Sequence, residues 1–198
     1  MPPPKTQLLR LIPRRQPSSL ARSHHRLFLT TTSPPQHLAA SRTLPYASEP
    51  LYEIIADVDS YQSFVPYCSH SRVTSWSEPD VRGRRWPALA DLHVGWGRFE
   101  EVFTSRLRCL PGVSVEAVSD GTASAVFKTL VTRWSFRPLS SDPTTPKTQV
   151  HFTVDYQFLS PIYAAVSAAV SHKVADVMIE AFEKRAREKL AVDRPFQQ

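Results

Sequence analysis

The chain has only two cysteines and five glycines among its 198 residues, and this scarcity excludes several classes of protein. Cys68 and Cys109 belong to no C-x-x-C pair and have no histidines at metal-ligand spacing, so we expect neither a disulfide scaffold nor a metal site. Both thiols are predicted to be reduced and partly buried. The sequence has no glycine-rich phosphate loop and no alternation of strands with helices, so it does not predict a Rossmann fold.

Acidic side chains are missing from the first 48 positions. Residues 1–48 carry 7 of the 24 basic side chains and none of the 18 acidic ones, so 17 basic and 18 acidic side chains remain in the rest of the chain. The formal net charge of +6 therefore belongs to the N-terminal segment. Because nucleic-acid recognition needs a basic surface on the folded domain, we expect no nucleic-acid partner.

The N-terminal segment also lacks a long apolar run, which excludes a secretory signal core and a membrane span. Residues 1–42 are rich in Arg, Ser, Thr and Pro, a composition typical of a mitochondrial presequence followed by a flexible linker. This interpretation places the protein in the mitochondrion, on the matrix side of the inner membrane. The alternative is a disordered tail without a targeting function. Residues 193–198 are expected to form a second disordered tail.

Two short helices are predicted near the start of the folded part. Ser48 and Pro50 are typical of a helix start, with a capping side chain and a proline in the first turn. Asp57 or Asp59 is expected to cap a second, shorter helix over residues 60–65. The apolar face of the first helix has helical spacing and consists of Leu51, Ile54, Ile55 and Val58.

Apolar patterns further along the chain predict six strands and a final helix. The strands are expected over residues 69–76, 86–94, 98–108, 113–118, 125–139 and 149–159. Ser160 and Pro161 then begin a helix that runs to about Leu190, with an apolar residue at every fourth position. A run of antiparallel strands followed by a long apolar helix predicts an α+β fold, in which a curved sheet wraps around the C-terminal helix.

This order of elements, together with five sequence segments, resembles the START-like polyketide-cyclase superfamily and, within it, the mitochondrial coenzyme Q-binding proteins. The segments are LYEIIADVDSYQSFVPYCSHSRV (51–73), FEEVFTSRL (99–107), FKTLVTRWSFRP (127–138), HFTVDYQF (151–158) and AFEKRA (181–186). The resemblance implies a helix-grip, lipid-binding domain over residues 43–192, with a first strand before Pro45. Residues 41–48, where that strand is expected, lack the charged alternation typical of the family.

The resemblance further implies a lipid-binding protein that is not an enzyme and has no catalytic cofactor. Its expected ligand is ubiquinone (coenzyme Q) or a biosynthetic intermediate of ubiquinone, held in an apolar cavity. Such a carrier supports respiratory electron transport and ubiquinone biosynthesis, touches the inner membrane peripherally, and serves biosynthetic or respiratory complexes as partners. The basic residues Arg82, Arg84 and Arg85 lie in a polar loop and are candidates for contact with anionic lipid head groups.

The candidate ligand-binding residues are apolar side chains that share one face of the predicted sheet or the apolar stripe of the final helix. They are Leu92, Val94, Phe103, Leu107, Leu130, Trp134, Phe136, Phe152, Val154, Tyr156 and Phe158 from the strands and Val166, Val170, Val174 and Met178 from the helix. For each residue the alternative is that it fills a solid core. The Trp134 N–H and the Tyr156 O–H are the candidate donors to a quinone carbonyl.

Two other functions stay open. A cyclase- or dehydratase-type enzyme of the same fold requires an inward-facing acid, base or His/Tyr pair, whereas His93 and His151 fall on the polar faces of their strands. Glu100 and Glu101 are neighbours on a strand, so their side chains point to opposite faces. A ribosome-interacting module requires a basic exposed face, which the nearly neutral folded part does not favour.

Overall fold

The computed structural model describes residues 33–96, 99–119, 124–140, 142 and 144–191, with the backbone alone at residues 96, 99 and 163–172. All seven strands form one antiparallel sheet in the order β1-β7-β6-β5-β4-β3-β2. The six predicted strands and the long final helix are confirmed. The elements are β1 (Gln36–Leu44), α1 (Ser48–Ala56), the 3-10 helix η1 (Val58–Ser63), β2 (Cys68–Trp76), β3 (Pro87–Trp96), β4 (Phe99–Leu110), β5 (Ser114–Ser119), β6 (Phe127–Pro138), β7 (Thr148–Phe158) and α2 (Pro161–Leu190).

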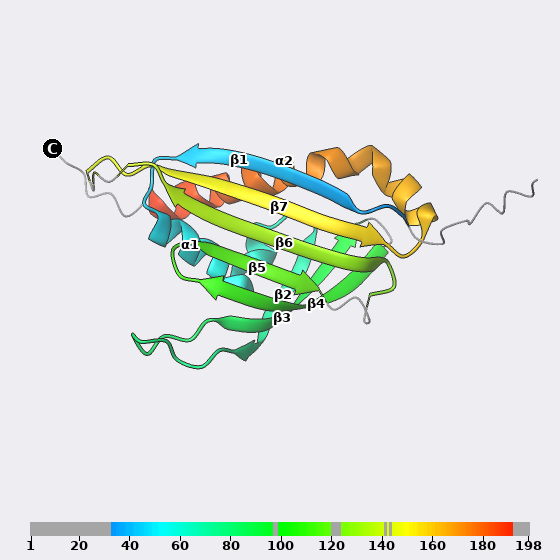
Figure 1. Ribbon diagram of the computed structural model, residues 1–198, viewed down its shortest axis with the longest axis horizontal. Helices are drawn as coiled ribbons and strands as arrows, with labels where there is room; N and C mark the ends of the chain where they lie inside the picture. Colours follow the sequence, from blue (N-terminus) through cyan, green and yellow to red (C-terminus); the bar gives the residue numbers. More distant parts are fainter. Residues whose placement is uncertain (1–32, 97–98, 120–123, 141, 143, 192–198) are drawn as a thin grey trace, which may run out of the picture.

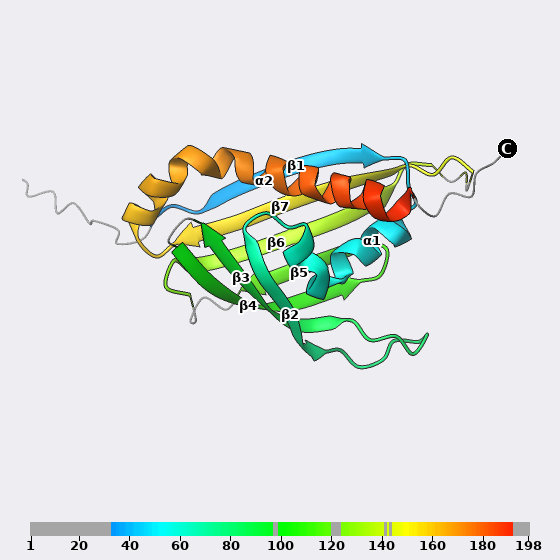
Figure 2. The same ribbon diagram turned by 180° about the vertical axis from the view of Figure 1, so that it is seen from behind.

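The molecule has two layers, a curved sheet and the helices on one of its faces. Figure 1 shows the sheet from the side opposite α2. Figure 2 shows α2 running along the other face, with α1 beside its C-terminal half. This is the predicted α+β helix-grip arrangement, and the face of the sheet that meets the helices is called the inner face below.

The inward-facing residues of β7 form the centre of the core. Val150 and Phe152 point inward and are buried beneath α2, whereas His151 between them is exposed on the opposite face. Ile179 and Phe182 of α2 are completely buried against the sheet. Burying an apolar side chain of this size contributes about 1.5–3 kcal/mol relative to leaving it in water, so these contacts hold the helix on the sheet.

The starts of α1 and α2 both agree with the sequence in position, with α1 beginning at Ser48 and Pro50 in its first turn, but the cap of α1 differs from the prediction. Ser160 caps α2, since its Oγ accepts a hydrogen bond from Ile162 N at 3.3 Å, and Pro161 occupies the first turn. In α1 the cap position is Ala47, which has no side-chain acceptor, so the predicted Ser48 cap is wrong. Among the described helices, none is long and apolar enough to cross a membrane.

The second short helix is the 3-10 helix η1, and its predicted aspartate cap is also wrong. No side-chain cap hydrogen bond is formed at its N-terminus, where Asp57 is the cap residue. The Asp59 carboxylate instead accepts a hydrogen bond from Val73 N of β2 at 2.6 Å. This bond ties η1 to the sheet, so the aspartate acts across elements. The predicted apolar residues Leu51, Ile54 and Ile55 of α1 are buried, and so is Val58, which the structure places at the start of η1.

Strand β1 begins earlier than the sequence indicates. It starts at Gln36, inside the segment interpreted as a flexible linker, and pairs with β7 as far as Leu44, which lies opposite Thr148. Just before it, the buried Ser33 Oγ donates to Phe158 O at 3.2 Å and accepts from Phe158 N at 2.9 Å. The strand depends on pairing with a segment more than a hundred residues away, which the local pattern of residues does not reveal.

The predicted turn at Pro111 and Gly112 connects β4 to β5. Gly112 has φ +69°, and a Cβ at this position would lie only 2.9 Å from the Glu49 carboxylate. The backbone conformation therefore favours glycine here, whereas the Glu49 carboxylate, at the end of a flexible side chain, can move aside. The turn predicted at residues 120–121 lies outside the described residues.

Candidate ligand-binding site

All the candidate residues from the strands lie on the inner face of the sheet. The register places Leu92 opposite Phe103, Trp134 opposite Phe152 and Leu130 opposite Tyr156 on neighbouring strands. Cross-strand partners share a face, so the apolar alternation of four strands combines into one continuous surface. The structure thus brings together side chains from β3, β4, β6 and β7 that the sequence placed on one face.

The half of this surface beneath the C-terminal half of α2 is filled by the protein's own side chains. The Trp134 ring lies 4.3 Å from the Phe152 ring and 5.0 Å from the Phe182 ring, measured between centroids. Phe136 also faces Phe182, at 6.2 Å. Trp134, Phe136 and Phe152 are each less than a tenth exposed, so they form core at this end.

A second aromatic group lies at the other end of β6 and β7. Phe127 stacks on Phe158 at 4.8 Å and meets Tyr156 and Phe103 edge-on at 5.9 and 5.7 Å. Phe127 was not among the candidates, because a register shift between Phe127 and Thr129 breaks the alternation of β6. Periodicity that continued through the bulge would have assigned it to the wrong face.

Some of the candidates are only half-buried, although they belong to the inner face. On the sheet these are Leu92, Val94, Leu107 and Leu130. On α2, Val174 and Met178 are also half-buried. The candidates Val166 and Val170 lie where only the backbone is described. The incompletely covered part of the inner face therefore runs from β3 across β4 to β6.

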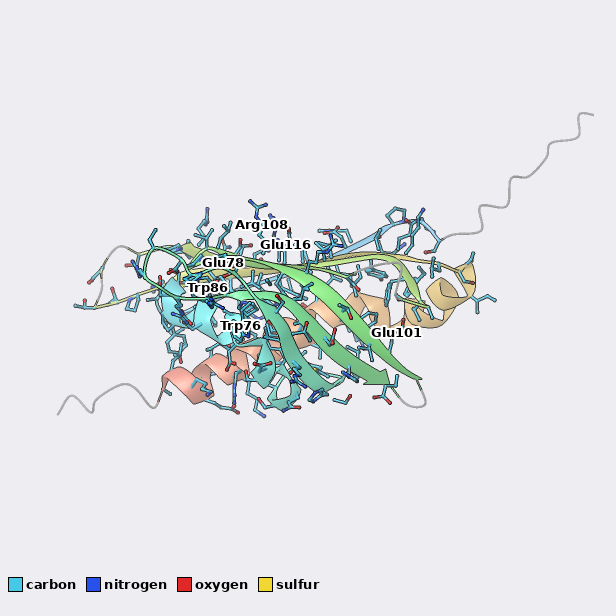
Figure 3. All side chains as sticks on the ribbon, turned by 90° about the horizontal axis from the view of Figure 1, so that it is seen from below. Trp76, Glu78, Trp86, Glu101, Arg108 and Glu116 are labelled. Carbon is cyan, nitrogen blue, oxygen red and sulfur yellow. The ribbon has the colours of Figure 1, made fainter. Side chains whose placement is uncertain are left out.

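The inner face also carries polar side chains that the sequence analysis did not select. Ser105 of β4 and Ser119 of β5 lie opposite each other and are both buried. Glu101 points to the same face as Phe103, and its Oε1 accepts hydrogen bonds from Ser124 Oγ and Ala125 N, each at 2.8 Å. Figure 3 shows Glu101 at the end of the sheet remote from Trp86. Glu101 and Ser105 could have been identified from the sequence, because each is two residues from Phe103 on β4 and therefore lies on the same face.

The two candidate donors differ from ordinary buried polar groups. No hydrogen bond joins the Trp134 N–H or the Tyr156 O–H to another described residue. The buried hydroxyl of Tyr52 on α1 likewise has no acceptor or donor within the described part of the chain. Burial, and next to it the neighbouring Cys109, raises the pKa of Tyr52 above its ordinary value, so the hydroxyl stays neutral.

Neither cysteine has the environment of a nucleophile. Burial raises the pKa of Cys68 and that of Cys109 above the ordinary value of a thiol. Cys68 Sγ donates to His70 O at 3.3 Å, which is a contact with backbone and not with a base. Both thiols are free, and among the described residues no group of three or more metal-binding side chains is formed.

Two hollows are lined by described residues, and neither coincides with the candidate site. The smaller, of about 140 Å³, lies where the start of α1 meets the β6–β7 connection, beside Ala47, Pro138 and Thr148. The larger, of about 270 Å³, lies between η1 and α2, beside Phe64 and Arg185. The predicted cavity adjoins the part of α2 whose side chains are not described, so it stays a prediction.

Comparison with known proteins agrees with this architecture. Residues 44–183 match the family model described as polyketide cyclase / dehydrase and lipid transport. A START superfamily protein from Mycobacterium smegmatis has a similar fold, with a TM-score of 0.62 at 16% identity; the match covers 77% of this chain and 97% of that one. At this low identity the similarity establishes the fold alone.

Two curated relatives are more similar in sequence. The mitochondrial coenzyme Q-binding protein coq10 of Schizosaccharomyces pombe is 33% identical over 148 residues, which cover 75% of this chain and 85% of the relative. The ribosome association toxin RatA of Pseudomonas aeruginosa is 30% identical over 152 residues, covering 77% of this chain and 96% of the relative. The chain therefore belongs to the polyketide cyclase / dehydrase and lipid transport family, as a START-like protein related to the mitochondrial coenzyme Q-binding proteins.

Proposed function

We propose that the protein is a non-catalytic carrier that binds ubiquinone or a biosynthetic intermediate between the sheet and α2. The observation that carries this proposal is the continuous apolar inner face, of which Leu92, Val94, Leu107 and Leu130 stay only half-buried. The relationship to proteins named for coenzyme Q binding selects the ligand among apolar molecules. A cyclase-type enzyme stays the alternative within the same fold, with the inward-facing Glu101 as its only evident acid in the described part of the inner face.

The physical chemistry of a polyprenyl quinone suits exchange with a membrane. Each buried methylene group is worth about 0.8 kcal/mol relative to water, but the quinone tail leaves a bilayer that is equally apolar. Burial in the protein therefore gains little, and affinity depends on shape and on hydrogen bonds to the head group. Tyr156, Ser105 and Ser119 supply donors along the inner face for this purpose, whereas the predicted donor Trp134 is covered by Phe182.

The proposed carrier acts in the mitochondrion, on the matrix side of the inner membrane, and supports respiratory electron transport and ubiquinone biosynthesis. The connection between β2 and β3 extends away from the body of the molecule (Figure 2) and is our candidate for membrane contact. Val81 at its tip is completely exposed, and the exposed Arg82 and Arg85 follow it in the chain. An exposed aliphatic side chain followed by exposed cations suits the surface of an anionic bilayer.

A rigid support makes this tip a defined surface. The Asp80 carboxylate accepts hydrogen bonds from Arg82 N at 2.8 Å, from Arg84 N at 2.9 Å and from the Trp86 indole N–H at 3.1 Å. The Arg84 guanidinium lies 4.1 Å from the centroid of the Trp86 ring and pairs with Glu53 of α1. The connection is thereby joined to α1, so the tip is held in one orientation.

The test is extraction of lipid from the purified full-length protein, followed by titration with a short-chain quinone. We expect co-purifying quinone and a rise in the unfolding temperature on titration. Leu130→Trp fills the inner face and should weaken quinone binding at least about tenfold. Leu110→Trp is the matched control, because Leu110 is 42% exposed and lies on the opposite face of the sheet. Equal binding by the two variants, or a protein that yields no quinone and shows no thermal shift, would contradict the proposal.

Association with the ribosome is a second candidate, which the opposite face of the sheet favours. Arg106, Arg108 and Arg133 are exposed there, and among the described residues only Arg133 has an ionic partner, Glu116 at 2.6 Å. Figure 3 shows Arg108 and Glu116 on the face away from α2. Co-sedimentation with ribosomes that is lost in an Arg106→Gln, Arg108→Gln double variant would support this function, and a failure to co-sediment would end it.

A further inference from the structure

A separate hollow lies between η1 and the C-terminal half of α2, away from the inner face of the sheet. It has a volume of about 270 Å³ and is called the α2–η1 hollow below. None of its lining residues belongs to the candidate quinone site. They are Ser63, Phe64, Ala181, Lys184, Arg185 and Glu188.

Arg185 is the unusual residue of this hollow. Its side chain is only 19% exposed, and its guanidinium lies 5.4 Å from the centroid of the Phe64 ring. The Nε–H is closed off from solvent and has no acceptor among the residues that the structure describes. A guanidinium has five N–H donors, and a buried charged donor without an acceptor is unfavourable. Because the Nε–H is closed off, a ligand in the hollow meets the Nη groups of the guanidinium, which carry the other four donors.

Glu188 only partly neutralises this charge. Its Oε2 lies 4.0 Å from Arg185 Nη1, and its Oε1 lies 4.0 Å from Lys184 Nζ. Both distances exceed the range of a hydrogen bond, which ends near 3.2 Å for nitrogen and oxygen. Two cations thus face one carboxylate, which leaves the lining of the hollow with a net positive charge.

We propose that the α2–η1 hollow binds the phosphate group of a small ligand. Arg185 is the main donor, because its planar fork matches two phosphate oxygens, and Lys184 supplies the second charge. Phe64 holds the guanidinium in place from one side. Pockets for drug-sized molecules occupy about 300–1,000 Å³, so this smaller hollow suits a head group or a simple phosphate ester. The site is independent of quinone binding.

The direct test observes the Arg185 side chain of the full-length protein by NMR during titration with inorganic phosphate. We expect a saturable shift of the Nε–Hε signal. Arg185→Gln should lower the affinity for phosphate at least about tenfold. Arg187→Gln is the matched control, since it removes the same charge from the same helix at a 65% exposed side chain paired with Glu183. Equal losses in both variants, or no saturable shift, would overturn the proposal.

If Arg185→Gln does not fold, a variant that is expected to tighten phosphate binding still tests the proposal. Glu188→Gln removes the competing carboxylate and should tighten phosphate binding several-fold, whereas Lys184→Gln should weaken it. An unchanged affinity in both variants would overturn the proposal.

Vesicles of phosphatidylglycerol, with phosphatidylcholine as reference, identify the source of the phosphate. Vesicle binding that is lost in Lys184→Gln indicates a lipid head group, and binding of inorganic phosphate alone indicates a soluble ester.

Discussion

Two tyrosines, the buried Tyr52 and the half-buried Tyr61, show how much a hydroxyl contributes to stability apart from its ring. Tyr52 packs edge-on against Trp86 at 5.2 Å but has no hydrogen-bond partner among the described residues, whereas the Tyr61 hydroxyl donates to Ile55 O. We predict that Tyr52→Phe leaves the free energy of unfolding nearly unchanged, because the polar group beside this hydroxyl is the Cys109 thiol, a weak hydrogen-bond partner. Tyr61→Phe should lower the free energy of unfolding by about 1 kcal/mol. Urea unfolding measures both, and equal effects would contradict the assignment.

The Asp80 carboxylate gives the β2–β3 connection a predicted dependence on pH. Hydrogen bonds from Arg84 N first, and then from the Trp86 indole, lower the pKa of Asp80 below its ordinary value. A carboxylate with a lowered folded pKa stabilises the connection at neutral pH, and this contribution is lost as the pH falls through that pKa. We predict that the Trp86 indole N–H signal titrates below the ordinary aspartate range.

The control for this titration is Asp80→Asn, which keeps the size of the side chain and removes its charge. In this variant the acid transition of the Trp86 signal should disappear, and the amides of Arg82 and Arg84 should exchange faster with solvent. A transition that persists in Asp80→Asn would assign the titration to another group.

At the scale of elements, β1 is the part of the sheet whose contribution is easiest to isolate. A chain that begins at Ser33 keeps the strand and the two hydrogen bonds of Ser33 with Phe158, so we predict an unfolding temperature equal to that of the full chain. A chain that begins at Pro45 exposes the edge of β7 and should aggregate or lose cooperative unfolding. Calorimetry and light scattering on the two chains test this, and a stable monomer without β1 would refute it.

The packing of α2 predicts a gradient of stability along the helix. Phe182 is completely buried against Trp134, so Phe182→Ala should lower the free energy of unfolding by about 3–5 kcal/mol. Met178 is half-buried and lies among the candidate ligand contacts. Met178→Ala should therefore cost less than about half as much, and should weaken quinone binding more than the loss of stability explains. Comparable destabilisation by the two variants would show that the helix is packed uniformly.

For the whole molecule, local periodicity predicted the elements well and their partners poorly. The clean alternation of β7 and the helical spacing of Leu51, Ile54 and Ile55 were sufficient, because each pattern repeats within a few residues. A first strand before Pro45 was expected and is present, but its start at Gln36 was missed, because β1 is stabilised by pairing with β7 and a distant partner does not show in the local pattern.

For the candidate site too, local periodicity predicted the face on which a residue lies but not what packs against it. The alternation of β6 correctly placed Trp134 and Leu130 on the inner face. It cannot show whether such a residue belongs to the solid core or lines a binding site, because that depends on which side chain of another element packs against it. Phe182 covers Trp134, and the structure leaves Leu130 half-buried. Glu101 and Ser105 were overlooked because they interrupt an apolar pattern whose spacing they otherwise follow.

The pairing of the first strand with the last has a consequence for biosynthesis. Leu44 of β1 lies opposite Thr148 of β7. A nascent chain on the ribosome therefore contains β1 long before its partner strand β7 has been translated. Until the codons for β7 have been read, the growing polypeptide presents unpaired backbone groups that invite wrong association. The domain thus completes its fold only after nearly all of it has been synthesised.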